Sequence, residues 1–195
     1  MKKKTLALSV LVALLGAWSV LFRQLDFPIL PAAPFLKMDV SDVPVLVGLM
    51  SGGPMAAVGV SFIRDFINFL LKGGEMGLPV GAMMSFISSL GFYLPLHYYL
   101  KQPVPRKKKS YLVTIVFSIC LMTLVASLLN YFIALPLYIK IFNFPIDNIL
   151  AYILALIVPF NLIKGVLLAL ITYFTIPIID KIIKNRPYNY YYQKD

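Results

Sequence analysis

Long apolar runs dominate the chain, and short polar or proline-containing segments separate them. A helix needs about 20 apolar residues to cross the hydrocarbon core of a bilayer. The runs predict six membrane-spanning helices, the second of them short, at residues 5–22, 43–50, 55–71, 79–100, 111–136 and 160–183. Because this leaves no room for a separate soluble domain, we expect residues 1–195 to form a single all-α membrane bundle.

The segments between the runs predict how the helices connect. Residues 26–41 combine three prolines with apolar side chains, which indicates a loop that folds back over the bundle as a lid. The following Ser41-Asp42-Val43-Pro44 segment has the composition of a helix start, and we expect one of its first two residues to be the N-cap. The Gly52-Gly53-Pro54 sequence predicts a tight turn. Pro159 is expected to end a separate lead-in helix at residues 149–158.

Composition places the chain among integral membrane proteins. Hydrophobic residues make up 60% of the sequence and charged residues only 13%, whereas about a quarter of the residues of an average soluble protein are charged. The mean hydropathy is +0.84. The net charge of +10 comes from lysines and arginines at the ends of apolar runs, where such residues determine membrane topology. We therefore expect membrane lipid, and no nucleic acid, as a partner.

The distribution of positive charge predicts the orientation. With six helices, the side that holds both termini carries twelve lysines and arginines, and the opposite side carries four. Because cytoplasmic segments are enriched in these residues, we expect both termini in the cytoplasm of a multi-pass protein of the cell (plasma) membrane. The lid and the start of the last helix then lie on the outer side, which predicts a pocket that opens outward.

Asn161 and Lys164 are the polar residues that packing explains least well. They stand three residues apart at the start of an apolar run, so a helix places them on one face. A lysine inside a membrane helix costs about 2.5–3.5 kcal/mol on insertion scales, which makes it a candidate functional residue. In the alternative interpretation, Lys164 extends its ammonium to the membrane interface and Asn161 caps a turn. Arg64 and Asp65 also lie inside an apolar run, where they can pair with groups on neighbouring helices or line a polar interior; we expect structural pairing.

The chemistry of these side chains suits a planar heterocycle. Asn130 lies at a depth similar to that of Asn161 and Lys164, although it can instead bond to a neighbouring helix. Carboxamides present a donor and an acceptor, and lysine adds donors and positive charge. This set matches a ring edge that alternates carbonyl, N–H and carbonyl, as in a pyrimidine-dione. Phe35, Tyr131 and Phe160 can cover the faces of such a ring.

Few residues favour catalysis. Cys120 and His97 are each the single residue of their type, which excludes an intrachain disulfide and leaves a catalytic triad or metal site little to build on. The sequence has no Gly-x-x-x-x-Gly-Lys-Ser/Thr motif, and therefore no P-loop. A membrane enzyme acting on a lipid or a phosphate would depend on the carboxylates Asp39 and Asp42. We expect a protein that is not an enzyme, has no metal site and needs no cofactor.

Five motifs carry a resemblance to a known family. In chain order they are Phe27-Pro28-Ile29, Asp39-Val40-Ser41-Asp42-Val43-Pro44, Gly53-Pro54, Asn130-Tyr131-Phe132 with Pro136, and Pro159-Phe160-Asn161-Leu162-Ile163-Lys164-Gly165. The whole chain resembles the riboflavin-specific S component, the substrate-binding membrane subunit of energy-coupling-factor (ECF) vitamin transporters. The resemblance implies a six-helix S-component fold that binds riboflavin, as the transported substrate, near the outer face beneath the lid.

The resemblance also implies a set of ligand-binding residues. Asn130, Asn161 and Lys164 are expected to hydrogen-bond the isoalloxazine ring. The full predicted set is Asn130, Asn161, Lys164, Asp39, Phe35, Leu36, Met38, Tyr131, Phe160 and Gly81. Residues 75–81 match the family pattern only loosely, so the contacts to the ribityl chain are not predicted.

A face of small residues on the first helix predicts a partner interface. Ser9, Ala13 and Ala17 follow one another at four-residue spacing, which leaves a smooth surface that another helix can approach closely. The first helix of the family carries an Ala-x-x-x-Ala motif that docks on the transmembrane coupling protein, and residues 13–17 match it. The resemblance thus implies that coupling protein and two cytoplasmic ATP-binding subunits as partners. The alternatives are an S component for another vitamin and a stand-alone secondary transporter.

Overall fold

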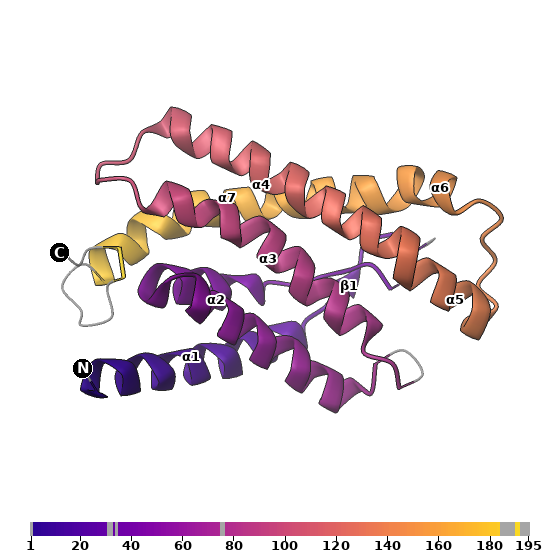
Figure 1. Ribbon diagram of the computed structural model, residues 1–195, viewed down its shortest axis with the longest axis horizontal. Helices are drawn as coiled ribbons and strands as arrows, with labels where there is room; N and C mark the ends of the chain where they lie inside the picture. Colours follow the sequence, from indigo (N-terminus) through magenta and orange to yellow (C-terminus); the bar gives the residue numbers. More distant parts are fainter. Residues whose placement is uncertain (1, 31–32, 34, 75–76, 184–189, 192–195) are drawn as a thin grey trace.

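The computed structural model describes residues 2–30, 33, 35–74, 77–183 and 190–191 (Figure 1). Its α-helices are α1 (Lys2–Arg23), α2 (Asp42–Lys72), α3 (Val80–Leu100), α4 (Lys108–Leu129), α5 (Leu135–Phe142), α6 (Ile149–Tyr152) and α7 (Val158–Ile183). Two π-helical turns, η1 (Asn130–Ala134) and η2 (Ile153–Ile157), connect α4 to α5 and α6 to α7. Two short strands, β1 (Phe27–Pro28) and β2 (Lys37–Met38), form an antiparallel ribbon.

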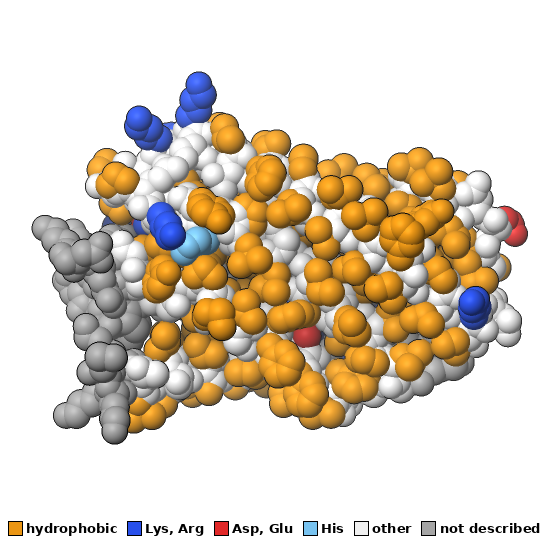
Figure 2. Space-filling model, in the orientation of Figure 1, with side chains coloured by type: hydrophobic (Ala, Val, Ile, Leu, Met, Phe, Trp, Pro, Cys, Tyr) orange, Lys and Arg blue, Asp and Glu red, His pale blue; other side chains and the backbone are white. Residues whose placement is uncertain are grey.

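The helices have the length and composition of membrane spans, which confirms the prediction of an all-α membrane protein. Among the residues that the structure describes, five helical segments are long and apolar enough to cross a membrane, namely Thr5–Arg23, Asp42–Lys72, Val80–Leu100, Lys108–Ile141 and Ile149–Ile183. Figure 2 shows the corresponding surface: hydrophobic side chains cover the middle of this face, and Lys and Arg side chains lie mainly towards its two ends.

The longest α-helix contains the break that the sequence predicts. Gly53 in α2 has φ 75° and ψ −166°, a backbone conformation that is essentially restricted to glycine. The parts of α2 before and after Gly53 lie side by side, since Arg64 in the second part forms an ion pair of 2.8 Å with Asp42 in the first. The predicted helices 43–50 and 55–71 are thus two arms of α2.

Replacing Gly53 with alanine is expected to lower the stability of the folded protein by about 1–3 kcal/mol, the cost of holding an alanine in this conformation. The new Cβ would also lie 2.8 Å from the ring of Tyr190. Thermal unfolding in detergent measures the loss. Gly59→Ala in the same helix is the control, because Gly59 does not have a positive φ and its Cβ would meet only Val12. Equal melting temperatures for the two variants would contradict the prediction.

Pro136 and Pro159 each follow a π-helical turn. The prediction that Pro159 ends a separate helix is wrong, because α7 runs from Val158 through Pro159 without a break. Proline lacks an N–H group, and in an α-helix its ring clashes with the carbonyl four residues earlier. That carbonyl belongs to η2, where the wider hydrogen-bonding pattern of a π-helix relieves the clash. Pro136 stands in the same relation to η1.

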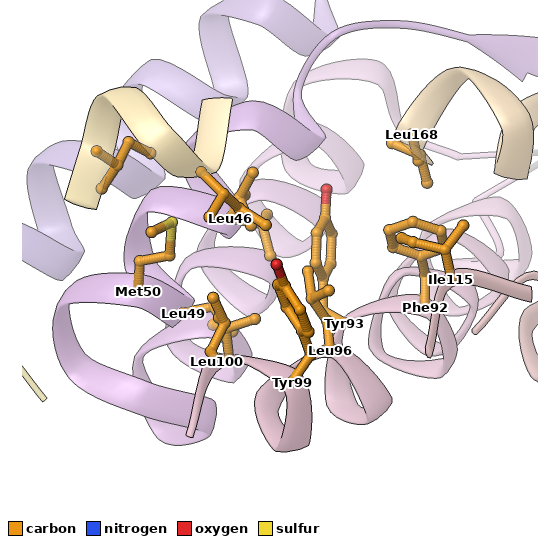
Figure 3. Close-up of a cluster of buried hydrophobic side chains, with 14 of the residues drawn as sticks. Leu46, Leu49, Met50, Phe92, Tyr93, Leu96, Tyr99, Leu100, Ile115 and Leu168 are labelled. Atoms are coloured by element: carbon orange, nitrogen blue, oxygen red, sulfur yellow. The ribbon is translucent and has the colours of Figure 1, made fainter. Parts of the chain in front are cut away.

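The main hydrophobic core connects α2, α3, α4 and α7. Figure 3 shows side chains of all four helices meeting there; the labelled residues are Leu46, Leu49, Met50, Phe92, Tyr93, Leu96, Tyr99, Leu100, Ile115 and Leu168. Gly91 allows α3 to approach α4 closely, since a Cβ at this position would lie 3.2 Å from the backbone of Met122. The core fixes these four helices relative to one another. The same helices carry polar residues near one end of the bundle.

The predicted lid is present and packs on that end. The ribbon pairs Phe27 with Met38, and the segment after β1 returns to the bundle through Leu36. Leu36 and Met38 are buried in a second hydrophobic cluster that includes Ile157 of η2 and Phe160 of α7. The prediction of a loop that folds back over the bundle is therefore confirmed, although Pro31 and Pro34 lie outside the described residues.

Candidate ligand-binding site

A cavity of about 490 Å³ lies beneath the lid. Its volume falls within the range of about 300–1,000 Å³ that is typical of small-molecule sites. Residues of α1, α2, α3, α4, η1, α5 and α7 and of the lid surround it. The lining residues are Arg23, Asp26, Phe35, Leu36, Lys37, Asn68, Phe69, Lys72, Gly74, Gly81, Ala82, Met84, Ser85, Ser88, Ala126, Asn130, Ala134, Tyr138, Phe160, Asn161 and Lys164.

Most of the predicted ligand-binding residues line this cavity. They are Phe35, Leu36, Gly81, Asn130, Phe160, Asn161 and Lys164. The other three residues do not line it. Met38 is buried in the second hydrophobic cluster, and Asp39 forms an ion pair with Arg23. Tyr131 is exposed, and its ring contacts that of Phe132. For all ten residues, a contact with the ligand stays a prediction.

The two asparagines are held in the same way. Nδ2 of Asn130 donates a hydrogen bond of 2.8 Å to the carbonyl of Ala126, and Nδ2 of Asn161 donates one of 2.8 Å to the carbonyl of Ile157. Each carboxamide therefore keeps its carbonyl oxygen and a second N–H for another partner. Asn130 begins η1 and Asn161 follows η2, and π-helical turns are frequent at functional sites.

Lys164 faces the interior of the protein. The residue is 8% exposed, and Nζ lies 3.7 Å from Oδ2 of Asp42. The alternative in which Lys164 extends to the membrane interface is wrong, because the ammonium lies inside the protein beside the carboxylate of Asp42. The lysine thus presents its donors in the same cavity as the two asparagines.

A buried ionic cluster lies behind Lys164. Arg64 is at its centre and is fully buried. The guanidinium pairs with Asp42 at 2.8 Å and with Asp65 at 2.7 Å, and it also donates to Ser89 at 2.9 Å. Arg23, at the end of α1, extends the cluster towards the lid through an ion pair of 3.0 Å with Asp39.

The structure corrects the sequence interpretation of Asp42. Ser41 occupies the N-cap position of α2, but its side chain makes no capping hydrogen bond, and Asp42 accepts from Arg64 instead. The reason is that a carboxylate in a membrane interior gains more from a buried cation than from a backbone N–H. The sequence predicted that Arg64 and Asp65 pair with groups on neighbouring helices, but the two residues pair most closely with each other, and Arg64 also pairs with Asp42 of the same helix. Their connection to Lys164 was also missed. The signal in the sequence was the presence of both cations and carboxylates within or beside apolar runs, because charges inside a membrane protein pair with one another.

The mouth of the cavity carries a second, more exposed group of charges. Oδ2 of Asp26 lies 2.9 Å from Nζ of Lys72 and 3.6 Å from Nζ of Lys37. Burial acts to raise the pKa of Asp26, but the hydrogen bond from Lys72 and the charges of Lys37 and Lys72 outweigh it and hold that pKa below its usual value. These ion pairs connect the lid to the end of α2.

The donor set of the cavity suits binding of an organic molecule. Two carboxamides and an ammonium offer hydrogen bonds in several directions, and Phe35, Leu36 and Phe160 offer apolar surface. Within the residues that the structure describes, no group of three or more His, Cys, Asp or Glu side chains is arranged to hold a metal ion. The lining of the cavity is thus chemically compatible with a small organic molecule.

Comparisons with known proteins identify a family and several relatives. The model of the family "ECF transporter, substrate-specific component" matches residues 6–176. The chain is 36% identical to the riboflavin transporter RibU of Streptococcus thermophilus, over 80% of this chain and 74% of that protein. It is 34% identical to RibU of Staphylococcus aureus, over 87% and 86%, and 32% identical to the riboflavin transporter FmnP of Bacillus subtilis, over 83% and 86%.

A solved structure shows the same fold. The S component of a bacterial ECF transporter superposes with a TM-score of 0.75 at 29% sequence identity, over 93% of this chain and 99% of that one. The family model and the relatives both cover most of the sequence. The chain belongs to the family of substrate-specific components of ECF transporters.

Proposed function

We propose that this protein is the riboflavin-binding subunit of an ECF transporter and mediates uptake of the vitamin across the cell membrane. The observation that carries the proposal is the convergence of Asn130, Asn161 and Lys164 on one cavity under an apolar lid. Relatives that share most of the sequence are named riboflavin transporters. The protein is a binding subunit rather than an enzyme, and riboflavin is its substrate rather than a cofactor.

The cavity offers a complementary surface for the isoalloxazine ring. Asn130 and Asn161 each retain a carbonyl oxygen and an N–H, which match the N–H and carbonyl groups at the polar edge of the ring. Lys164 donates to a further carbonyl. Phe35 and Phe160 supply apolar and aromatic surface for the faces of the ring. A lid that keeps water from these hydrogen bonds would strengthen them.

Six membrane spans with both termini in the cytoplasm fit the arrangement of the helices. The two arms of α2 on either side of Gly53 count as separate spans in this topology. The start of α1, the loop between α3 and α4, and the end of α7 lie at one end of the molecule (Figure 1). That loop contains five lysines and arginines within residues 101–109, as cytoplasmic loops do. The cavity, at the opposite end, then opens to the outside.

A coupling membrane protein and two ATP-binding subunits are the proposed partners. Ser9, Ala13 and Ala17 are exposed on α1, so the face of small residues is accessible to another helix. The opposite face of α1 packs on α2, where a Cβ on Gly16 would lie 2.6 Å from Ile63. The fold therefore leaves uncovered the side of α1 that carries the small residues, and small residues allow another helix to pack closely.

Replacing Ala13 with phenylalanine is expected to reduce association with the coupling protein at least about tenfold, because a large side chain prevents close approach of the two helices. Riboflavin binding by the isolated subunit should not change, since Ala13 is not part of the cavity lining. Co-purification from membranes measures the association. The control is Leu112→Phe, because Leu112 is also exposed but lies on α4 rather than on α1. Wild-type association of Ala13→Phe would contradict this interface.

Uptake of labelled riboflavin into proteoliposomes tests the proposed function. The protein should support uptake only together with the coupling protein, the two ATP-binding subunits and ATP. Uptake by the protein alone in an ion gradient would identify a secondary transporter instead. ATP-dependent uptake of another vitamin, but not of riboflavin, would show that the protein is an S component with a different substrate.

A further inference from the structure

Asp42 stands directly behind Lys164 and is not part of the cavity lining. Its Oδ2 lies 3.7 Å from Nζ of Lys164, while its Oδ1 accepts hydrogen bonds of 2.8 Å from Arg64 and 2.7 Å from Ser89. The hydroxyl of Tyr93 donates to the backbone carbonyl of Asp42 at 2.9 Å. Held by α2 and α3 together, the carboxylate has a fixed position from which its second oxygen faces the lysine.

The ion pairs that link Arg23 and Lys164 of the cavity lining to the groups behind them form one electrically neutral cluster. The pairs are Arg23–Asp39 (3.0 Å), Arg23–Asp65 (3.9 Å), Arg64–Asp65 (2.7 Å), Arg64–Asp42 (2.8 Å) and Lys164–Asp42 (3.7 Å). No side chain among them is more than 13% exposed. Three cations thus face three carboxylates, and the charges balance only when Lys164 is counted. Lys164 is part of this balance before any ligand binds.

We propose that Asp42 is a positioning residue of the ligand site and serves as the fixed counterion of Lys164. The inference rests on the proposed function, in which Lys164 contacts riboflavin. Riboflavin carries no charge, so its ring cannot neutralise the lysine that it covers. An ammonium buried without a counterion is strongly unfavourable in a low-dielectric site. The carboxylate of Asp42 offsets the cost of burying the ammonium before the ligand binds. A charged lysine can therefore donate hydrogen bonds to an uncharged ligand.

The Asp42→Asn variant tests this role, because it keeps the shape of the side chain and removes its charge. Riboflavin affinity, measured by quenching of flavin fluorescence on the purified protein in detergent, should fall at least about tenfold. Asp65→Asn is the matched control. Asp65 is an equally buried partner of Arg64 that makes no ion pair with Lys164, so its loss should reduce affinity much less than the loss of Asp42.

A double-mutant cycle separates positioning from general stability. In the Lys164→Met background, Asp42→Asn should change riboflavin affinity less than about twofold, because the group that Asp42 serves is gone. An equal loss in both backgrounds would show that Asp42 acts through the fold and would overturn the proposal. Asp42→Glu, which retains the charge, should bind more tightly than Asp42→Asn.

Chemical rescue provides an independent readout. In Asp42→Ala, added formate can occupy the space of the missing carboxylate and should restore part of the riboflavin affinity, whereas the Asp42→Ala/Lys164→Met variant should not respond. Absence of rescue, together with wild-type affinity in Asp42→Asn, would overturn the role of Asp42 while riboflavin binding by the wild type stands. If the wild type itself does not bind riboflavin, the proposed function fails instead.

Discussion

Replacing Lys164 with alanine is expected to weaken riboflavin binding about ten- to a hundredfold. A hydrogen bond to a charged group contributes about 1.5–3 kcal/mol, and each 1.4 kcal/mol is about a tenfold change in the dissociation constant. The fold should persist, because Asp42 keeps its bonds to Arg64 and Ser89. Fluorescence titration of the purified variant measures the affinity, and its elution as a single species on gel filtration verifies the fold.

Asn161→Ala should weaken binding in the same direction by about tenfold, since it removes neutral hydrogen bonds from the same edge of the ring. Lys72→Ala is the matched control for Lys164→Ala. Lys72 also lines the cavity, but it lies at the mouth, where it pairs with Asp26 and is 34% exposed. Its removal should change the affinity little. If Lys164→Ala and Asn161→Ala both bind as tightly as the wild type, the ring does not contact this site.

Replacing Arg64 with alanine is expected to destabilise the protein by about 3–5 kcal/mol, the typical cost of removing one partner from a buried ion pair. Arg64 is fully buried, and its removal takes away the closest cation from both Asp42 and Asp65. Heating in detergent, followed by gel filtration, measures the fraction that stays folded.

Two further variants test whether the loss of stability in Arg64→Ala comes from the buried ion pairs. Arg64→Lys retains the charge and should be less damaging than Arg64→Ala, although lysine cannot reproduce the bidentate contact with Asp65. Lys72→Ala removes a more exposed ion pair, which is worth about 0–1 kcal/mol. Similar stability of Arg64→Ala and Lys72→Ala would contradict the view that the buried cluster holds the bundle together.

Much of the fold could be predicted from hydrophobic patterning. The long apolar runs predicted the membrane helices, and the glycines at 52–53 with Pro54 predicted the break in α2. The prediction that Pro159 ends a helix was wrong because a π-helical turn precedes this proline and lets the helix continue through it. The pattern of apolar residues around 153–157 does not distinguish a π-helical turn from an α-helical one.

The candidate site was predictable in part. Asn161 and Lys164 were identifiable because polar residues in a membrane helix are costly, and the structure places both in one cavity with Asn130. The role of Asp42 was not identifiable, because a carboxylate before a helix has the same local sequence whether it caps that helix or pairs across the bundle. Only the return of α2 at Gly53 brings Arg64 to Asp42.

Titration of the purified protein with riboflavin tests the central claim most directly. The account predicts that the protein, alone in detergent, quenches the fluorescence of added riboflavin until one equivalent is bound and takes on the yellow colour of the flavin. It also predicts that Lys164→Ala shifts the titration to higher riboflavin concentration. Folded wild-type protein that leaves the fluorescence unchanged at every concentration would contradict the account.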